Sequence, residues 1–203
     1  MKELLGIFSV LIVCVAYFPY IRDTLLGRTK PHAVSWLVWG VLAAIAFGVQ
    51  ITNGGGPGAW LMAVNTVLIA VIFGLALWRG EKHIMRAEWF SLLFSAVAIA
   101  LWVVVKQPLL CVILISLTDA IGGFLPTFRK SRRNPFQETA SMYGLFGLSL
   151  VWSLLALTDF TVVNALYPAS FMAINILMAL YLVNRRRAFY IHRYRGAEVL
   201  ARE

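Results

Sequence analysis

An aspartate stands near the middle of the apolar segment 108–127, where a charge is expensive. Placing a carboxylate at the centre of a membrane-spanning helix costs about 2.5–3.5 kcal/mol. Low-dielectric surroundings favour the neutral form of such a group, and a carboxyl that exchanges protons is what a proton relay needs. We therefore interpret Asp119 as a proton-coupling residue. The alternative is a neutral, hydrogen-bonded structural side chain.

Two asparagines lie inside other apolar segments and share their local sequence. Asn65 and Asn175 each close the pattern Met-Ala-aliphatic-Asn, at 62–65 and 172–175. Each amide offers a carbonyl acceptor and two N–H donors, so a matched pair can hold a hydroxyl- or amide-rich solute. The alternative is hydrogen bonding between helices, worth about 0.6 kcal/mol each. We predict that both bind substrate.

Two tryptophans are further candidates for contact with a solute. Trp39 and Trp152 lie in separate apolar segments, and an indole stacks on a sugar face or a flat heterocycle. We predict them as substrate-binding residues, with packing in the protein or against lipid as the alternative.

Prolines and glycines near the ends of two apolar segments predict hinges. Pro19 ends one segment, and Gly122, Gly123 and Pro126 end another. Proline removes a helical hydrogen bond and glycine weakens a helix, so both permit bending. The alternative is close packing of helices on small residues.

The composition requires a membrane to position these groups. The chain has 203 residues, of which 61% are hydrophobic and 13% charged. Soluble domains are roughly 45–50% apolar and about 25% charged. The mean hydropathy of +0.80 therefore predicts an all-α integral membrane protein, because only helices and closed barrels satisfy the backbone in lipid.

Seven apolar segments are long enough to cross the hydrocarbon as helices, which takes roughly 20 residues each. They lie at about 4–21, 33–52, 58–78, 88–105, 108–127, 140–157 and 163–183. We predict a multi-pass protein of the cell membrane, inner or plasma, with the lipid bilayer as its first partner.

The positions of the basic residues predict the orientation. Sixteen of the 18 Lys and Arg residues fall in 22–30, 79–86, 129–133 and 185–202. Only Lys2 and Lys106 lie on the other side, so the positive-inside rule places the N-terminus outside and the C-terminus in the cytoplasm. Trp60, Trp89 and Tyr167 fall near segment ends and are expected at the membrane interfaces. The basic loops are expected to attract anionic lipid headgroups.

The sequence contains an internal duplication. Residues 59–65 and 169–175 agree at four of seven positions, and a nearby offset of 107 residues pairs Trp36 with Tyr143 and Gly40 with Gly147. Spans one to three and five to seven therefore form parallel repeats around a single linking span. The predicted divisions are a first three-helix repeat, a linker helix, a second three-helix repeat and a basic cytoplasmic tail, at 1–80, 81–106, 107–184 and 185–203.

These features resemble the PQ-loop superfamily, which includes the SWEET sugar transporters and the cystinosin-like exporters. The resemblance rests on the prolines that end the first helix of each repeat, on Asn65 and Asn175, and on the run from Asp119 to Gly123. The glutamine that follows each proline in the family is replaced here by Tyr20 and Thr127. The chain thus resembles a divergent, prokaryotic-looking member.

The resemblance implies a fold of three, one and three helices that works by alternating access. It also implies that the two asparagines face each other across the substrate pocket. In some cystinosin-like members the equivalent aspartate is linked to proton coupling, so the resemblance implies the same role for Asp119.

Several other classes of function find no support in the sequence. The motifs of serine hydrolases, zinc proteases and P-loop enzymes are missing, so we expect neither an enzyme nor a cofactor. Cys14 and Cys111 are expected to be small buried side chains, and His32, His83 and His192 do not have the spacing of a metal site. The net charge of +9 sits in loops, so nucleic acid is not an expected partner.

The sequence therefore predicts a small-solute secondary transporter or facilitator for a sugar- or metabolite-like substrate. One alternative is a receptor, accessory or scaffold protein that transports nothing. Another is a vitamin facilitator of the nicotinamide-riboside kind. A midplane cavity lined by both asparagines favours a carrier, and a packed centre favours a scaffold. Homo-oligomer formation stays open.

Overall fold

The computed structural model describes residues 1–27, 31–80, 86–133 and 135–200. Within these ranges, the side chains of 86–88, 126, 130, 133, 137 and 189–200 are not described.

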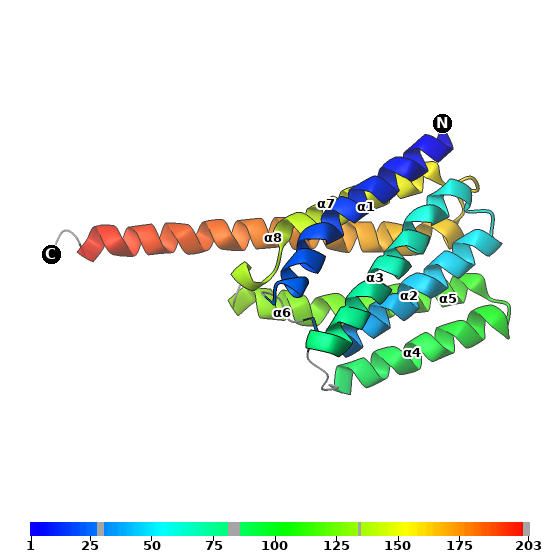
Figure 1. Cartoon of the computed structure of the whole chain (residues 1–203), viewed down its shortest axis with the longest axis horizontal. Coiled ribbons are helices and arrows are strands. Elements are labelled where there is room, and N and C mark those ends of the chain that lie inside the picture. Colours follow the sequence, from blue (N-terminus) through cyan, green and yellow to red (C-terminus); the bar gives the residue numbers. More distant parts are fainter. Residues whose placement is uncertain (28–30, 81–85, 134, 201–203) are drawn as a thin grey trace.

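The described residues form helices joined by short turns (Figure 1). In chain order the elements are α1 (Lys2–Leu25), α2 (Ala33–Thr52), η1 (Gly56–Ala59), α3 (Trp60–Arg79), α4 (Arg86–Val103), α5 (Pro108–Thr118), η2 (Asp119–Phe124), α6 (Leu125–Arg133), η3 (Pro135–Gln137), α7 (Ala140–Ala156) and α8 (Val162–Leu200).

The predicted all-helical, multi-pass character is confirmed. Five helical segments of the described chain are long and apolar enough to span a membrane, and the apolar helices Trp89–Val103 and Ala140–Ala156 are shorter. Side chains such as Phe8, Val15 and Phe18 on α1 are more than half exposed. Apolar surface of this kind is stable only against lipid.

Two helices lie between others in the bundle. Helix α3 packs against both α1 and α2, and α8 packs against both α7 and α5. Helix α1 lies along α7, and it meets α2 through side chains, since the Trp36 indole N–H donates to the Tyr20 hydroxyl at 3.3 Å. The main core fills these contacts with apolar side chains, among them Leu42, Leu61, Met62 and Leu150.

Helix α4 lies at the edge of the bundle, against α2, α5 and η2 (Figure 1). Helix α4 packs closely against two glycines of neighbouring elements. A β-carbon at Gly48 would lie 2.3 Å from the Trp102 ring, and one at Gly122 would lie 2.2 Å from the Ser91 hydroxyl oxygen. Only glycine permits this approach, so α4 is held at two points that lie far apart along its length.

The fifth predicted span is interrupted by a π-helical turn. Helix α5 ends at Thr118, and residues Asp119–Phe124 widen into η2 before α6 continues. π-Helical turns are rare in proteins, and many of those that occur lie at functional sites. Two of the predicted hinge residues, Gly122 and Gly123, lie in this turn. Pro19 lies inside the unbroken α1. Pro126 lies in α6, and its side chain is outside the described residues.

Helix α8 runs for 39 residues and extends far beyond the bundle (Figure 1), and it includes residues 185–200 of the predicted basic tail. Two expectations differ from the structure. Cys14 is exposed, whereas Cys111 is buried as expected, because Cys14 lies on the outward face of α1. Tyr167 is 2% exposed rather than interfacial, because this face of α8 turns into the bundle.

Candidate functional site

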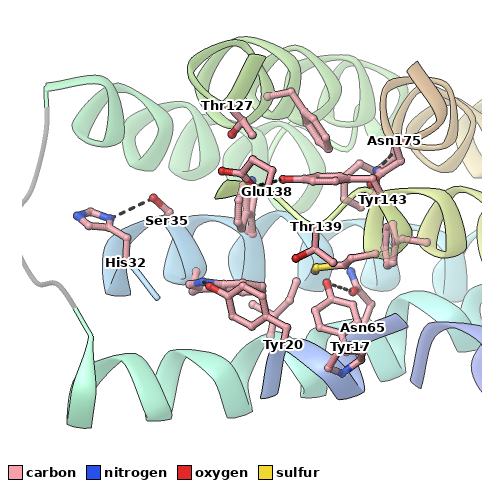
Figure 2. A pocket seen from close by; sticks show the side chains of 18 of the residues that line it. Tyr17, Tyr20, His32, Ser35, Asn65, Thr127, Glu138, Thr139, Tyr143 and Asn175 are labelled. Carbon is pink, nitrogen blue, oxygen red and sulfur yellow. Dashed lines mark hydrogen bonds between the residues drawn. The ribbon is translucent and has the colours of Figure 1, made fainter. Parts of the chain in front are cut away.

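A cavity of about 320 Å³ lies among α1, α2, α3, η2, α6, α7 and α8. Its inner end is bordered by Asn65, Tyr167 and Asn175, which lie well inside their helices. Its other end is bordered by His32 and Glu138, beside the starts of α2 and α7 (Figure 2). The cavity therefore runs from the middle of the bundle toward the face where these two helices begin.

Aromatic side chains form much of the cavity wall. Trp36 and Trp39 meet edge to face, with ring centroids 5.3 Å apart. Tyr17 meets Phe146 at 5.9 Å, and Phe146 meets Phe171 at 5.0 Å, both also edge to face. Edge-to-face contacts of this kind stabilise each other by about 0.5–1.5 kcal/mol per pair. The wall is thus formed before any solute enters.

Asn65 borders the cavity with an incompletely satisfied amide. The Tyr17 hydroxyl donates to Asn65 Oδ1 at 2.8 Å. The buried Asn65 Nδ2 has no hydrogen-bond partner among the described residues. A buried donor left unpaired costs about 1–3 kcal/mol, so a bound acceptor would recover that cost.

Asn175 also borders the cavity, but here the unpaired atom of the amide is the oxygen, Oδ1. Its Nδ2 donates to the Phe171 carbonyl oxygen at 2.8 Å. Because that partner only accepts, the orientation of the amide is fixed, and Oδ1 is left without a partner in the described part of the chain. The two asparagines stand on α3 and α8, which do not contact each other in the described residues. They thus approach the cavity from separate walls (Figure 2).

Asp119 lies just behind the cavity wall. It is 2% exposed and does not border the cavity, whereas Trp39 does. Trp39 Nε1 and Asp119 Oδ1 both lie beside Gly123, and Oδ1 of the carboxyl has no hydrogen-bond partner in the described chain. Trp39 therefore borders the cavity and lies beside the carboxyl.

The π-helical turn creates the space in which these two groups meet. A β-carbon at Gly123 would lie 2.6 Å from Trp39 Nε1 and 3.0 Å from Asp119 Oδ1. A larger residue at this position would displace the indole or the carboxyl.

The structure brings some predicted site residues together and leaves one apart. Asn65, Asn175, Trp39 and Pro19 border the cavity. Trp152 does not, and its ring packs 6.1 Å from that of Phe8. The cavity-facing side of α7 is occupied instead by Met142, Tyr143 and Phe146, whose spacing of three and four residues follows one helix face. Trp152 lies on a different face.

Tyrosines form a part of the cavity wall that the sequence did not predict. Tyr17, Tyr20, Tyr143 and Tyr167 all border the cavity. One signal was present in the duplication, which pairs Trp36 with Tyr143, and both border the cavity. No comparable pattern marks Tyr17.

The charges around the cavity are acidic. Its charged lining residues, among those described, are Asp23 and Glu138, and no Lys or Arg lines it. Asp23 is paired with Arg22 at 3.0 Å, and Glu138 accepts a hydrogen bond from the Tyr143 hydroxyl at 3.0 Å. The cavity therefore offers an anion no balancing positive side chain.

The opposite face of the bundle is closed by two loops that bind each other. We name loops 53–58 and 157–161 the clasp. Thr158 N donates to Gly55 O and Asp159 N donates to Gly54 O, both at 3.1 Å. Gly54 and Gly56 have φ values of +76° and +58°, in the left-handed region that glycine adopts without strain.

Polar side chains reinforce the clasp from α2 and α8. Asn164 Nδ2 donates to the carbonyl oxygens of Asn53, at 2.7 Å, and Asp159, at 2.9 Å. Gln50 Nε2 donates to the Asn164 carbonyl oxygen at 3.0 Å. The Lys2 ammonium donates to the carbonyl oxygens of Leu157 and Thr158. The chain thus closes one end of the bundle while the cavity reaches toward the other.

Metal ligands do not gather in the described residues, where no group of three or more His, Cys, Asp or Glu side chains forms a possible ion site. His83 and the side chain of His192 lie outside those residues.

Comparison with known proteins finds no match to a family model, to a curated protein or to a solved structure.

Proposed function

We propose that this protein is a small-solute secondary carrier that works by alternating access. The observation that carries the proposal is the shape of the bundle. A cavity bordered by Asn65 and Asn175 reaches toward one face, and the clasp closes the other. This is the form expected of a carrier open to one side, since alternating access exposes a central site to each side in turn.

The charge distribution supports the side to which the cavity opens. Among the described basic residues, Arg22 lies in the last turn of α1 beside Asp23, and Arg129 lies in α6 two residues after Thr127, so both are next to residues that border the cavity. The positive-inside rule assigns this face to the cytoplasm. The proposed state is therefore inward-facing, with the N-terminus and the clasp outside, in the inner or plasma membrane.

The packing of the helices supports the proposed arrangement of three, one and three spans. In residues 1–80 the third span packs against the first and second, and in 107–184 it does so again. Gly40 of α2 faces Ile69 of α3, and Gly147 of α7 faces Ile176 of α8. Two parallel repeats predict such equivalent contacts, with α4 as the linker in 81–106.

The resemblance to the PQ-loop and SWEET proteins supports the same proposal. It would give Asn65 and Asn175 the role of substrate ligands and Asp119 that of a proton-coupling group. A scaffold that binds no solute gains nothing from an aromatic cavity that places two incompletely bonded amides at its inner end, whereas a receptor is separated from a carrier by its lack of solute flux.

The test is solute flux through the purified protein in liposomes. A carrier releases preloaded radiolabelled solutes from a mixed metabolite panel faster than protein-free vesicles do, and unlabelled solute outside accelerates the release by exchange. Equal release from both preparations, for protein that binds solutes and is correctly folded, would contradict the carrier and favour the receptor or scaffold.

A further inference from the structure

We infer that the cavity takes an uncharged, flat ring that carries an amide edge, meaning a carbonyl beside a ring N–H. This inference rests on the proposed carrier function and specifies its substrate class. The first support is the size and shape of the cavity. Its volume of about 320 Å³ lies at the lower end of the range of small-molecule pockets, about 300–1,000 Å³. A solute of one or two fused rings suits it.

The aromatic wall favours a flat solute. Trp36 and Trp39 border the cavity from α2, and Phe146 and Phe171 border it from α7 and α8. Their edge-to-face packing fixes the ring orientations. Flat rings pack against such walls in stacked or edge-to-face geometry, which adds about 0.5–1.5 kcal/mol to simple burial.

The two asparagines give the inner end of the cavity a defined polarity. Tyr17 occupies Asn65 Oδ1 and leaves Nδ2 as a donor, whereas Phe171 O occupies Asn175 Nδ2 and leaves Oδ1 as an acceptor. The wall is therefore not symmetric, although the local sequences match. A ring with an amide edge presents one acceptor and one donor, which complements the one unpaired atom that each of the two walls offers.

The charges argue against an anion. No Lys or Arg is among the described cavity residues, Asp23 and Glu138 stand toward its mouth, and Asp119 lies beside Trp39. A carboxylate entering this cavity would lose its water without gaining a cation, which costs much more than moving a neutral amide. The most direct test therefore compares the binding of one ring compound with the binding of the same ring carrying an added carboxylate.

The experiment uses uracil, orotate and glucose as probes of the purified full chain in detergent. Orotate is uracil with one added carboxylate. Titration calorimetry and tryptophan fluorescence would measure binding, and we expect uracil to bind at least tenfold more tightly than either orotate or glucose. Equal binding of orotate and uracil, or binding of glucose alone, would overturn the inference.

Two variants locate the site. Asn65→Leu removes the Nδ2 donor and keeps a similar side-chain volume. We expect it to lower the affinity for uracil at least tenfold. Thr66→Val is the matched control, because the Thr66 hydroxyl donates to the Met62 carbonyl of its own helix and does not border the cavity. Unchanged uracil affinity in Asn65→Leu would also overturn the inference.

Failure of this inference is separable from failure of the carrier. Flux of other solutes without uracil binding would reject the substrate class and keep the carrier. Uracil binding that follows the variants, without flux of uracil or any other solute, would keep the binding site and reject the carrier.

Discussion

At the scale of single residues, the site depends on how each amide is oriented by its neighbour. The Tyr17 hydroxyl orients the Asn65 amide by donating to its Oδ1, and the Phe171 carbonyl orients the Asn175 amide by accepting from its Nδ2. Matching sequence motifs therefore do not give matching chemistry. The repeat predicted that two asparagines would share a site, and both border the cavity, but their polarity depends on contacts that are distant along the chain.

The Tyr17 hydroxyl should be needed for solute binding. Tyr17→Phe leaves Asn65 Oδ1 without its donor and frees the amide to rotate. We expect solute affinity to fall about tenfold and the free energy of unfolding to fall by about 1 kcal/mol. Calorimetry and thermal unfolding in detergent would measure both. Tyr181→Phe is the control, since Tyr181 packs on Phe128 away from the cavity, and an equal loss in both variants would contradict this role.

Replacing Asp119 should abolish proton coupling and leave solute exchange intact. In Asp119→Asn, we expect uptake driven by a pH gradient to fall to the level seen without the gradient, because the amide cannot exchange a proton. Exchange of solute at equal pH should continue, since Asp119 does not border the cavity. Liposome uptake with and without a gradient measures the two rates. Full gradient-driven uptake by the variant would show that Asp119 has a structural role only.

At the scale of helices and turns, hydropathy located the elements well because apolar length is a direct physical requirement. The segment 33–52 was expected as a helix, and α2 spans Ala33–Thr52. Helix rotation was less predictable. Trp152 and Tyr167 were assigned to the cavity and to the interface, yet Trp152 packs on Phe8 and Tyr167 borders the cavity. A helix with apolar residues on every side carries little sign of which face is inward.

The π-helical turn and the clasp were even harder to predict from the sequence than the helix rotations. Gly122 and Gly123 indicated a weak point, but not the widened turn that accommodates Trp39. Backbone hydrogen bonds such as Thr158 N to Gly55 O can form with any residue type except a proline donor. The sequence consequently marks the glycine-rich turn without naming the loop that it binds.

Glycine at position 56 should stabilise the clasp. Its φ of +58° costs other residues about 1–2 kcal/mol, and a β-carbon there would lie 2.1 Å from the Thr158 hydroxyl oxygen. We expect Gly56→Ala to lower the free energy of unfolding by at least that amount, measured by thermal unfolding in detergent. Gly74→Ala is the control, since its β-carbon meets no other side chain or distant backbone within 4 Å. Equal stability of the two variants would contradict the close fit.

At the scale of the whole molecule, the cavity and the clasp lie at opposite ends of one bundle. Arg186 binds the carbonyl oxygens of Pro135 and Glu138, and Arg185 binds that of Arg132. These contacts tie α8 to the connection that leads into α7. Since α1 lies along α7, the three helices α1, α7 and α8 form one connected unit.

The proposed orientation predicts opposite labelling of the two ends. In a background with Cys14→Ala and Cys111→Ala, a membrane-impermeant thiol reagent should label Thr161→Cys in the clasp from outside intact cells. It should label Ser35→Cys, which borders the cavity, only in inverted membrane vesicles. Mass spectrometry or a gel shift reads the result. The reverse pattern would place the N-terminus in the cytoplasm.

Helix α4 has a consequence for how selectivity can change. Its described side chains do not border the cavity, yet it contacts both α2 and α5 and meets Gly48 and Gly122 closely. Helix α2 carries Trp36 and Trp39, and the turn after α5 carries Phe124, on the cavity wall. The α4 side chains that meet Gly48 and Gly122 are therefore placed to influence the position of those walls from behind. A relative of this protein could accept a wider solute while every residue that touches the solute stays the same.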